Sequence, residues 1–217
     1  IKVAVDIEET NRVLPLPDGV DDRTAAAILL KGMTAQYLIR RTYAVVDGST
    51  VLLHAAAGGV GLILAQWAKS LGATVIGLVS TEEKAALARE NGCAHVLVVD
   101  RDAPAFAGQV RDLTDGRGVD VVYDSVGKVT FEDSLRSLRR LGTLASFGSA
   151  SGTPDPVDLH KTAAFGSPTL IRASLVNYIT TRDELLASAA DLFDAVAHGA
   201  VTVHINQTYP LTDVPQA

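Results

Sequence analysis

The chain is poor in the residues that build disulfide frameworks, nucleic-acid surfaces and membrane spans. Cys93 is the only cysteine among 217 residues, which excludes an internal disulfide framework and any metal site made from several cysteines. The net charge is −6 and no basic run occurs, so nucleic acid is not an expected partner. No apolar run is long enough to span a bilayer, so no membrane partner is expected either. With 47% hydrophobic residues, the composition predicts a compact cytoplasmic domain.

The most informative segment is an apolar stretch, Thr50–His54, that leads into a glycine-rich turn. The turn reads Ala56-x-Gly58-x-x-Gly61, which is typical of a dinucleotide-binding fingerprint. Gly58 would let the backbone N–H groups at a helix N-terminus approach a pyrophosphate, and Gly61 would let that helix pack on the strand. A glycine pattern alone also fits an ordinary helix start. The flanking strand, helix and second strand favour the dinucleotide.

The residues after the second predicted strand indicate which dinucleotide is bound. An NAD site carries an Asp or Glu about 20 residues beyond the fingerprint, where it accepts hydrogen bonds from the ribose. Here that place holds Ser80 and Thr81, with Lys84 one helical turn further on, which favours the 2′-phosphate of NADP. Alternatively, Thr81 is only an N-cap and Lys84 a solvated residue, and Glu82 and Glu83 would repel a phosphate that they faced.

Short apolar strands alternate with amphipathic helices along the chain. This pattern predicts an α/β fold of the Rossmann type: a doubly wound, six-stranded parallel sheet in a three-layer αβα arrangement. The predicted strands are Thr50–His54, Thr74–Val79, His95–Val99, Val119–Tyr123, Thr143–Phe147 and Thr169–Ala173. The predicted helices are Thr24–Arg41, Val60–Ser70, Glu82–Asn91, Ala105–Thr114, Phe131–Arg140 and Asp183–His198.

Small hydroxyl residues and glycines follow the later strands. Taken singly, each fits a turn as well as a ligand contact, but together on one edge of a sheet they favour a ligand. Asp100, Asp102 and Asp124 also follow strands and are expected to serve turns or caps. The five histidines are dispersed without metal-ligand spacing, so we expect structural or surface roles for His54, His95, His160, His198 and His204.

Several segments in register resemble the zinc-free, zeta-crystallin-like quinone oxidoreductases of the medium-chain dehydrogenase/reductase superfamily. The resemblance covers nearly the whole chain from about Val13. It implies NADPH-dependent reduction of quinones, or of related conjugated carbonyls, without a metal. The segments that carry it are Leu30–Leu38, His54–Gly61, Tyr123–Gly127, Ser146–Gly148 and Tyr178–Leu185.

The resemblance also implies where the cofactor is bound. Lys84 matches the lysine that the family places at the 2′-phosphate, whereas Val99 stands where the family often has a tyrosine near that phosphate or the adenine. No catalytic residue is assigned within this chain. Together with the fingerprint, the implied cofactor-binding residues are Thr34, Gly58, Gly59, Val60, Gly61, Ser80, Thr81, Lys84, Ser125, Ser146, Phe147, Gly148, Ser149, Arg172, Ala173 and Ser174.

Family members carry an N-terminal catalytic domain and a final segment that returns to it. By resemblance, residues 1–23 are a remnant of that domain boundary, 24–200 form the NADPH-binding domain and 201–217 begin the return. The resemblance also implies a homodimer through the edge of the strand Thr169–Ala173. Two alternatives stay open: a non-catalytic nucleotide-binding and dimerisation module, and an alkenal or enoyl reductase of the same superfamily.

Overall fold

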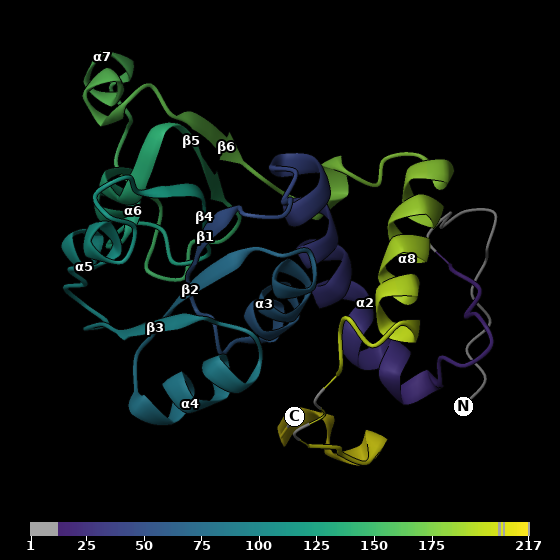
Figure 1. The fold of residues 1–217 in the computed structure, drawn as a ribbon. Helices are drawn as coiled ribbons and strands as arrows, with labels where there is room; N and C mark the ends of the chain where they lie inside the picture. The colour runs from purple at the N-terminus through teal and green to yellow at the C-terminus, as the bar shows by residue number, and fades with distance from the viewer. Residues whose placement is uncertain (1–12, 204, 206, 217) are drawn as a thin grey trace.

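Six parallel strands form one sheet in the computed structural model, which describes residues 13–203, 205 and 207–216 (Figure 1). The strand order is β3-β2-β1-β4-β5-β6 and every pairing is parallel, which confirms the predicted doubly wound sheet. The strands are β1 (Thr50–Leu53), β2 (Thr74–Val79), β3 (His95–Val98), β4 (Val119–Asp124), β5 (Leu138–Ser146) and β6 (Thr169–Arg172).

Helices cover both faces of the sheet (Figure 1). The α-helices are α2 (Asp22–Tyr37), α3 (Gly59–Ser70), α4 (Glu82–Glu90), α5 (Ala107–Asp112), α6 (Phe131–Ser137), α7 (Leu159–Thr162) and α8 (Arg182–Ala197). A π-helix, η1 (Leu38–Thr42), continues α2, and 3-10 turns form η2 (Ala163–Phe165), η3 (Leu175–Asn177) and η4 (Leu211–Gln216).

Side chains of the strands alternate between two apolar cores, as the period of a strand requires. On β1, Val51 and Leu53 join the larger core, which also holds buried residues of α2, α3, α4 and α8. Leu52 points the other way, into a smaller core with Phe106 and Leu135. Figure 1 shows the corresponding layers, with α2, α3 and α8 grouped on one side and α5 and α6 on the other. Burial on both faces explains why the central strands β1, β2 and β4 are largely apolar.

The largest errors of the sequence prediction lie around β5. The helix predicted over Phe131–Arg140 ends at Ser137, and the strand predicted to begin at Thr143 begins at Leu138, which pairs with Val119 before a register shift. Contacts with the neighbouring strand favour the extended chain here: Leu138 pairs with Val119, and the Arg139 guanidinium forms an ion pair with Asp120, a carboxylate that is 4% exposed. The helix predicted over Ala105–Thr114 is also shorter, at Ala107–Asp112.

Two predicted extensions are only partly described by the structure. The remnant expected over residues 1–23 is described from Val13 onward, and positions 204, 206 and 217 of the expected return segment lie outside the described residues. His204 therefore has no structural account. Within the described part of the chain, no helix is both long enough and apolar enough to cross a membrane.

Gly61→Ala should destabilise the fold, because a Cβ at this position would lie 2.4 Å from the Ala55 carbonyl oxygen, a backbone atom that cannot swing away. Overpacking of this kind costs about 1–3 kcal/mol. Urea unfolding should show that loss. The matched control is Gly108→Ala in α5, where nothing lies within 4 Å and unfolding should become about 0.5–1 kcal/mol less favourable. Equal effects of the two substitutions would contradict the tight packing assigned to Gly61.

Candidate functional site

The turn between β1 and α3 exposes unpaired backbone donors. Gly58 is the N-cap of α3 and has no side chain to accept the N–H groups of the first helical turn, which lack carbonyl partners within the helix. The turn begins at Ala55, whose φ of 49° is in the left-handed region. Because β1 pairs with both β2 and β4, the turn lies where the sheet changes winding direction, the position at which doubly wound folds bind ligands.

A cavity of about 500 Å³ lies against this turn, within the size range of small-molecule sites. Three of the predicted cofactor residues, Gly58, Ser80 and Lys84, line it. The strand ends that border it are those of β1, β2 and β3, with the loops after β4 and β5 opposite. The remaining wall is made by His54, Ala55, Ala57, Leu78, Val79, Val99, Asp100, Arg101, Asp102, Pro104, Val126, Val129, Thr130, Ala150 and Ser151.

The start of α4 combines a helix cap with a polar cavity wall. The Thr81 hydroxyl oxygen accepts a hydrogen bond from the Lys84 N–H at 3.3 Å, so Thr81 serves as an N-cap. The Lys84 Nζ donates to the Ser80 hydroxyl at 3.1 Å, which holds the ammonium group at the cavity. Glu82 and Glu83 are exposed and are absent from the cavity wall, so their carboxylates do not face it.

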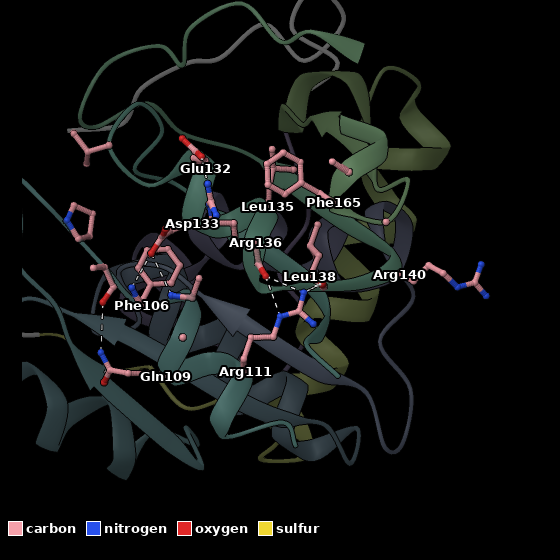
Figure 2. A pocket seen from close by; sticks show the side chains of 17 residues that line it. Phe106, Gln109, Arg111, Glu132, Asp133, Leu135, Arg136, Leu138, Arg140 and Phe165 are labelled. Atoms are coloured by element: carbon pink, nitrogen blue, oxygen red, sulfur yellow. Dashed lines mark hydrogen bonds and ion pairs between the residues drawn. The ribbon is translucent and has the colours of Figure 1, made fainter. Parts of the chain in front are cut away.

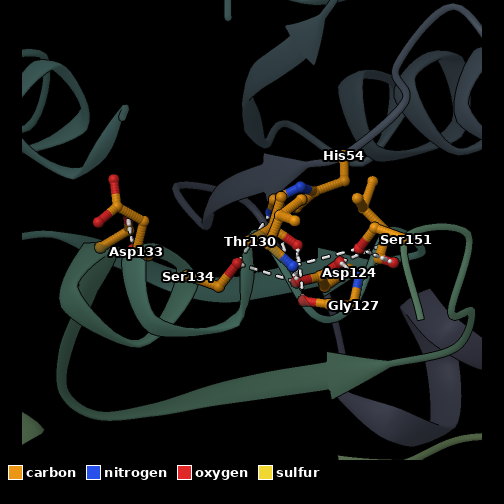
Figure 3. Close-up of polar contacts among 10 residues, drawn as sticks. His54, Asp124, Gly127, Thr130, Asp133, Ser134 and Ser151 are labelled. Atoms are coloured by element: carbon orange, nitrogen blue, oxygen red, sulfur yellow. Dashed lines mark hydrogen bonds and ion pairs between the residues drawn. The ribbon is translucent and has the colours of Figure 1, made fainter. Parts of the chain in front are cut away.

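A buried polar network, which includes the wall residues His54 and Thr130, lies beside the cavity (Figure 3). The fully buried Asp124 carboxylate accepts hydrogen bonds from the N–H groups of Val126 and Gly127, at 2.8 and 3.0 Å, and from the hydroxyls of Thr130 and Ser134, at 2.8 and 3.0 Å. Thr130 and Ser134 are four residues apart and lie on one face of the α6 segment. The carboxylate therefore ties the turn after β4 to α6.

His54 completes this network from the end of β1. Its Nε2 lies 3.0 Å from the Ser134 hydroxyl oxygen and 3.9 Å from the Asp124 carboxylate. Because the single Ser134 hydroxyl hydrogen is donated to Asp124, the Ser134 oxygen must accept a hydrogen bond from Nε2–H of the imidazole. Burial lowers the pKa of His54, although the nearby Asp124 charge opposes that shift. The side chain is thus a neutral imidazole that joins the turns after β1 and β4.

The expectation that Asp124 and His54 serve structure rather than chemistry agrees with these contacts. The same holds for Asp100, whose carboxylate accepts hydrogen bonds from the N–H groups of Asp102 and Ala103. The partnership between Asp124, Thr130 and Ser134 was not anticipated from the sequence. Its signal is a carboxylate at the end of a buried strand followed by two hydroxyl residues spaced one helical turn apart.

A second group of predicted residues lies at the carboxyl ends of β4, β5 and β6. The Arg172 guanidinium donates to the carbonyl oxygens of Ser146 and Ala173, at 3.1 and 3.2 Å. A Cβ on Gly148 would lie 2.4 Å from the Ser125 carbonyl oxygen, so these two loops touch. The segments Ser125–Gly127, Ser146–Ser149 and Arg172–Ser174 therefore form a continuous row beside the cavity, although none of the predicted cofactor residues in them lines it.

Thr34 lies apart from these contacts on α2. Its hydroxyl donates to the Leu30 carbonyl oxygen at 2.8 Å, one turn earlier in the same helix. The hydroxyl oxygen still has capacity to accept a further hydrogen bond. Its place at the cofactor remains a prediction.

A wider groove of about 1260 Å³ lies between α5, α6 and the segment before β6 (Figure 2). It extends from Pro104 and Val129, which also line the smaller cavity, to Leu138, the first residue of β5, and it does not include the glycine-rich turn. Its polar groups hold its own walls together: Arg111 donates to the Arg136 and Leu138 carbonyls, and Asp133 accepts from the Phe106 N–H. The larger volume therefore does not mark the candidate site.

The sequence and fold match known proteins. Residues 59–193, more than half of the chain, match the family model described as zinc-binding dehydrogenase. The chain belongs to this family. A quinone oxidoreductase of Pseudomonas aeruginosa is 45% identical over 95% of the chain and 63% of that protein, and a 2-haloacrylate reductase of Burkholderia is 46% identical over 91% of the chain and 59% of that protein. The structure of Escherichia coli quinone oxidoreductase complexed with NADPH superposes with a TM-score of 0.88, at 42% identity, over 95% of this chain and 63% of that one.

These matches confirm the resemblance to quinone oxidoreductases of the medium-chain dehydrogenase/reductase superfamily. The chain spans about three fifths of the length of the relatives that it matches. Within the described residues, no group of three or more His, Cys, Asp or Glu side chains is placed to hold a metal ion.

His54→Gln should change the acid sensitivity of the fold. Because burial lowers the pKa of His54 in the folded state, protonation below the unfolded pKa of about 6.5 favours unfolding, by up to about 1.4 kcal/mol per pH unit. Stability from the neutral imidazole is thus present above pH 6.5 and lost as the pH falls. Glutamine keeps an N–H donor but does not titrate. Urea unfolding at pH 7.5 and 5.5 should show a smaller acid loss for His54→Gln than for the wild type.

The exposed His160 supplies the control for that experiment, since His160→Gln removes a histidine outside the network. This variant should follow the wild-type profile. A parallel acid loss in the wild type and His54→Gln would contradict a neutral buried imidazole.

Proposed function

We propose that this chain is the NADPH-binding domain of an NADPH-dependent quinone reductase. The observation that carries the proposal is the arrangement at the carboxyl ends of β1 and β2. There, Gly58, the N-cap of α3, and the Lys84 ammonium group line one cavity, next to the first N–H groups of α3, which lack carbonyl partners within the helix. The named activity of the Pseudomonas relative and the NADPH in the Escherichia coli structure support the same assignment.

The cavity residues fit the parts of this cofactor. The N-terminus of α3 would hold the pyrophosphate, because its dipole and its free N–H groups favour a negative charge. Gly58 leaves open the space that a side chain would fill. Ser80 and Lys84 would contact the 2′-phosphate, and the row of loops after β4, β5 and β6 would orient the nicotinamide end.

When bound, NADPH supplies a hydride from the nicotinamide ring, which reduces a quinone without a metal. This chain's own residues bind and orient the cofactor, and we assign none of them a catalytic role. In our proposal the substrate is bound mainly by parts of the protein that the relatives have beyond the matched region. The domain limits expected from the sequence, at 24–200 with flanking segments, belong to the same proposal.

A second candidate is a reductase of conjugated alkenes. The specific observation in its favour is the 2-haloacrylate reductase of Burkholderia, which is as similar to this chain as the quinone oxidoreductase of Pseudomonas. Both reactions need the same cofactor domain, so they differ in the acceptor of the hydride. Turnover of a panel of quinones and a panel of alkenes by the full-length protein separates these two activities. An isolated chain that binds nucleotide but shows no turnover would instead be the non-catalytic binding module.

Lys84→Ala should weaken NADPH binding about ten- to a hundredfold and leave NADH binding nearly unchanged, because a charge-assisted phosphate contact contributes about 1.5–3 kcal/mol. Isothermal titration of the isolated chain with both nucleotides measures this.

Gly58→Val is the negative control, since its branched side chain would occupy the pyrophosphate position. It should abolish binding of both nucleotides while retaining the circular dichroism of the fold. Wild-type NADPH affinity in folded Gly58→Val would refute the assigned position.

We also propose a cytoplasmic homodimer that pairs through β6. This strand pairs only with β5 among the strands of the sheet, so it forms an edge. Its segment Thr169–Ile171 is apolar and carries no charge to discourage another strand. A two-fold partner would extend the sheet by pairing the same edge.

Leu170→Pro should break the dimer. The Ala173 N–H donates inward to the Ser146 carbonyl at 2.8 Å, and since donors alternate along a strand, the Leu170 N–H points outward. Proline removes that outward donor. Leu170→Ala loses comparable packing but keeps the N–H, so light scattering should give a monomer mass for the first variant and a dimer mass for the second. A monomer mass for the wild type at tens of micromolar would refute the pairing.

A further inference from the structure

The wall of the 500 Å³ cavity carries a second cation that comes from outside α4. Besides Lys84, the exposed Arg101 lines the cavity, from the loop that follows β3. Because β3 lies next to β2 in the sheet, this loop stands beside the Ser80 end of the cavity. Arg101 was not among the residues that the sequence predicted to contact a cofactor.

The loop that carries Arg101 is held by its own backbone contacts. The Asp100 carboxylate oxygen Oδ1 accepts hydrogen bonds from the N–H groups of Asp102 and Ala103, at 2.8 and 3.0 Å. These hydrogen bonds lower the pKa of Asp100, so the carboxylate stays ionised and committed to the turn. Arg101 therefore lies within a defined turn, which the Asp100 carboxylate closes by accepting hydrogen bonds from the N–H groups of Asp102 and Ala103.

The charges of the cavity wall explain why a second cation matters. The wall contains two carboxylates, Asp100 and Asp102, and two permanent cations, Lys84 and Arg101. With Lys84 alone the wall would have a net charge of −1, which opposes an incoming phosphate. Arg101 brings the sum to zero. Its planar guanidinium can also form two parallel hydrogen bonds to one phosphate, which an ammonium group cannot do.

The apolar side chain of Val99 leaves the recognition of a phosphate on the β3 side of the cavity to other residues. Val99 is half-buried and lines the cavity next to the Arg101 loop, and its side chain offers no hydrogen bond to a phosphate. Polar recognition on this side of the cavity must therefore come from the following residues. Arg101 is the donor among them.

We infer that Arg101 is a specificity-determining residue that, together with Lys84, clamps the 2′-phosphate of NADPH from the side of β3. The inference deepens the proposed function and rests on it. The two cations approach from different elements, α4 and the loop after β3, so the phosphate lies between them. Asp102 opposes the phosphate and limits the preference.

The test uses the isolated chain, titrated with NADPH, NADH and the two fragments adenosine 2′,5′-bisphosphate and 5′-AMP. Arg101→Ala should weaken binding of the two 2′-phosphorylated ligands about tenfold or more and leave NADH and 5′-AMP nearly unchanged. Arg101→Lys should recover part of the loss. Asp102→Asn should tighten the 2′-phosphorylated ligands selectively, because it removes a facing negative charge.

Arg89→Ala is the matched control. It removes an exposed arginine from the far end of α4, outside the cavity wall, with the same change in net charge. This variant should bind all four ligands like the wild type. Unchanged NADPH preference in Arg101→Ala, or an equal loss for ligands with and without the 2′-phosphate, would overturn the role of Arg101 while leaving the proposed function intact. A wild-type chain that binds neither NADPH nor NADH would overturn the proposed function and this inference with it.

Discussion

The site depends on one buried carboxylate, that of Asp124. A charge without solvent needs several donors, and Asp124 receives four hydrogen bonds, two from the turn that follows β4 and two from hydroxyls of the α6 segment. Loss of any one donor would leave a buried charge undersatisfied, at a cost of about 1–3 kcal/mol. This requirement fixes the turn after β4 and, through Ser134 and His54, the end of β1. The two strand ends between which the sheet reverses its winding are thereby held in one arrangement.

The fixed positions of the β1 and β4 strand ends determine the shape of the cavity. β1 delivers the glycine-rich turn, whose missing side chain leaves backbone donors at the N-terminus of α3. β2 delivers Ser80 and Lys84, and the loop after β3 delivers Arg101, so the positive groups lie along the carboxyl ends of adjacent strands. Because of the strand order, one part of the cavity wall, after β1, offers backbone N–H groups suited to a diphosphate, and the neighbouring part, after β2 and β3, offers cations suited to a further phosphate.

Much of this arrangement could be predicted from the sequence, because it depends on local patterns. Short apolar runs such as those of β1, β2 and β4, and a glycine turn between a strand and a helix, identify the sheet and its ligand-binding edge. The start of β5 at Leu138 was not predictable in this way, since it accompanies contacts with β4, namely the pairing of Leu138 with Val119 and the ion pair between Arg139 and Asp120. Nor was the His54–Ser134–Asp124 network, whose members are separated by up to 80 residues. Arg101 was not predicted because its loop reaches the cavity of Lys84 only through the pairing of β3 with β2, which is a property of the fold and not of the local sequence.

Hydrogen exchange of the isolated chain, with and without saturating NADPH, tests the central claim most directly. The claim predicts slower exchange in three segments that lie at the carboxyl ends of the strands: the turn at Ala55–Gly61, the start of α4 at Ser80–Lys84 and the loop at Asp100–Pro104. Exchange around Arg111 and Leu138, at the wider groove, should stay unchanged. Protection confined to that groove, or no protection at the glycine-rich turn despite saturated binding, would contradict the account.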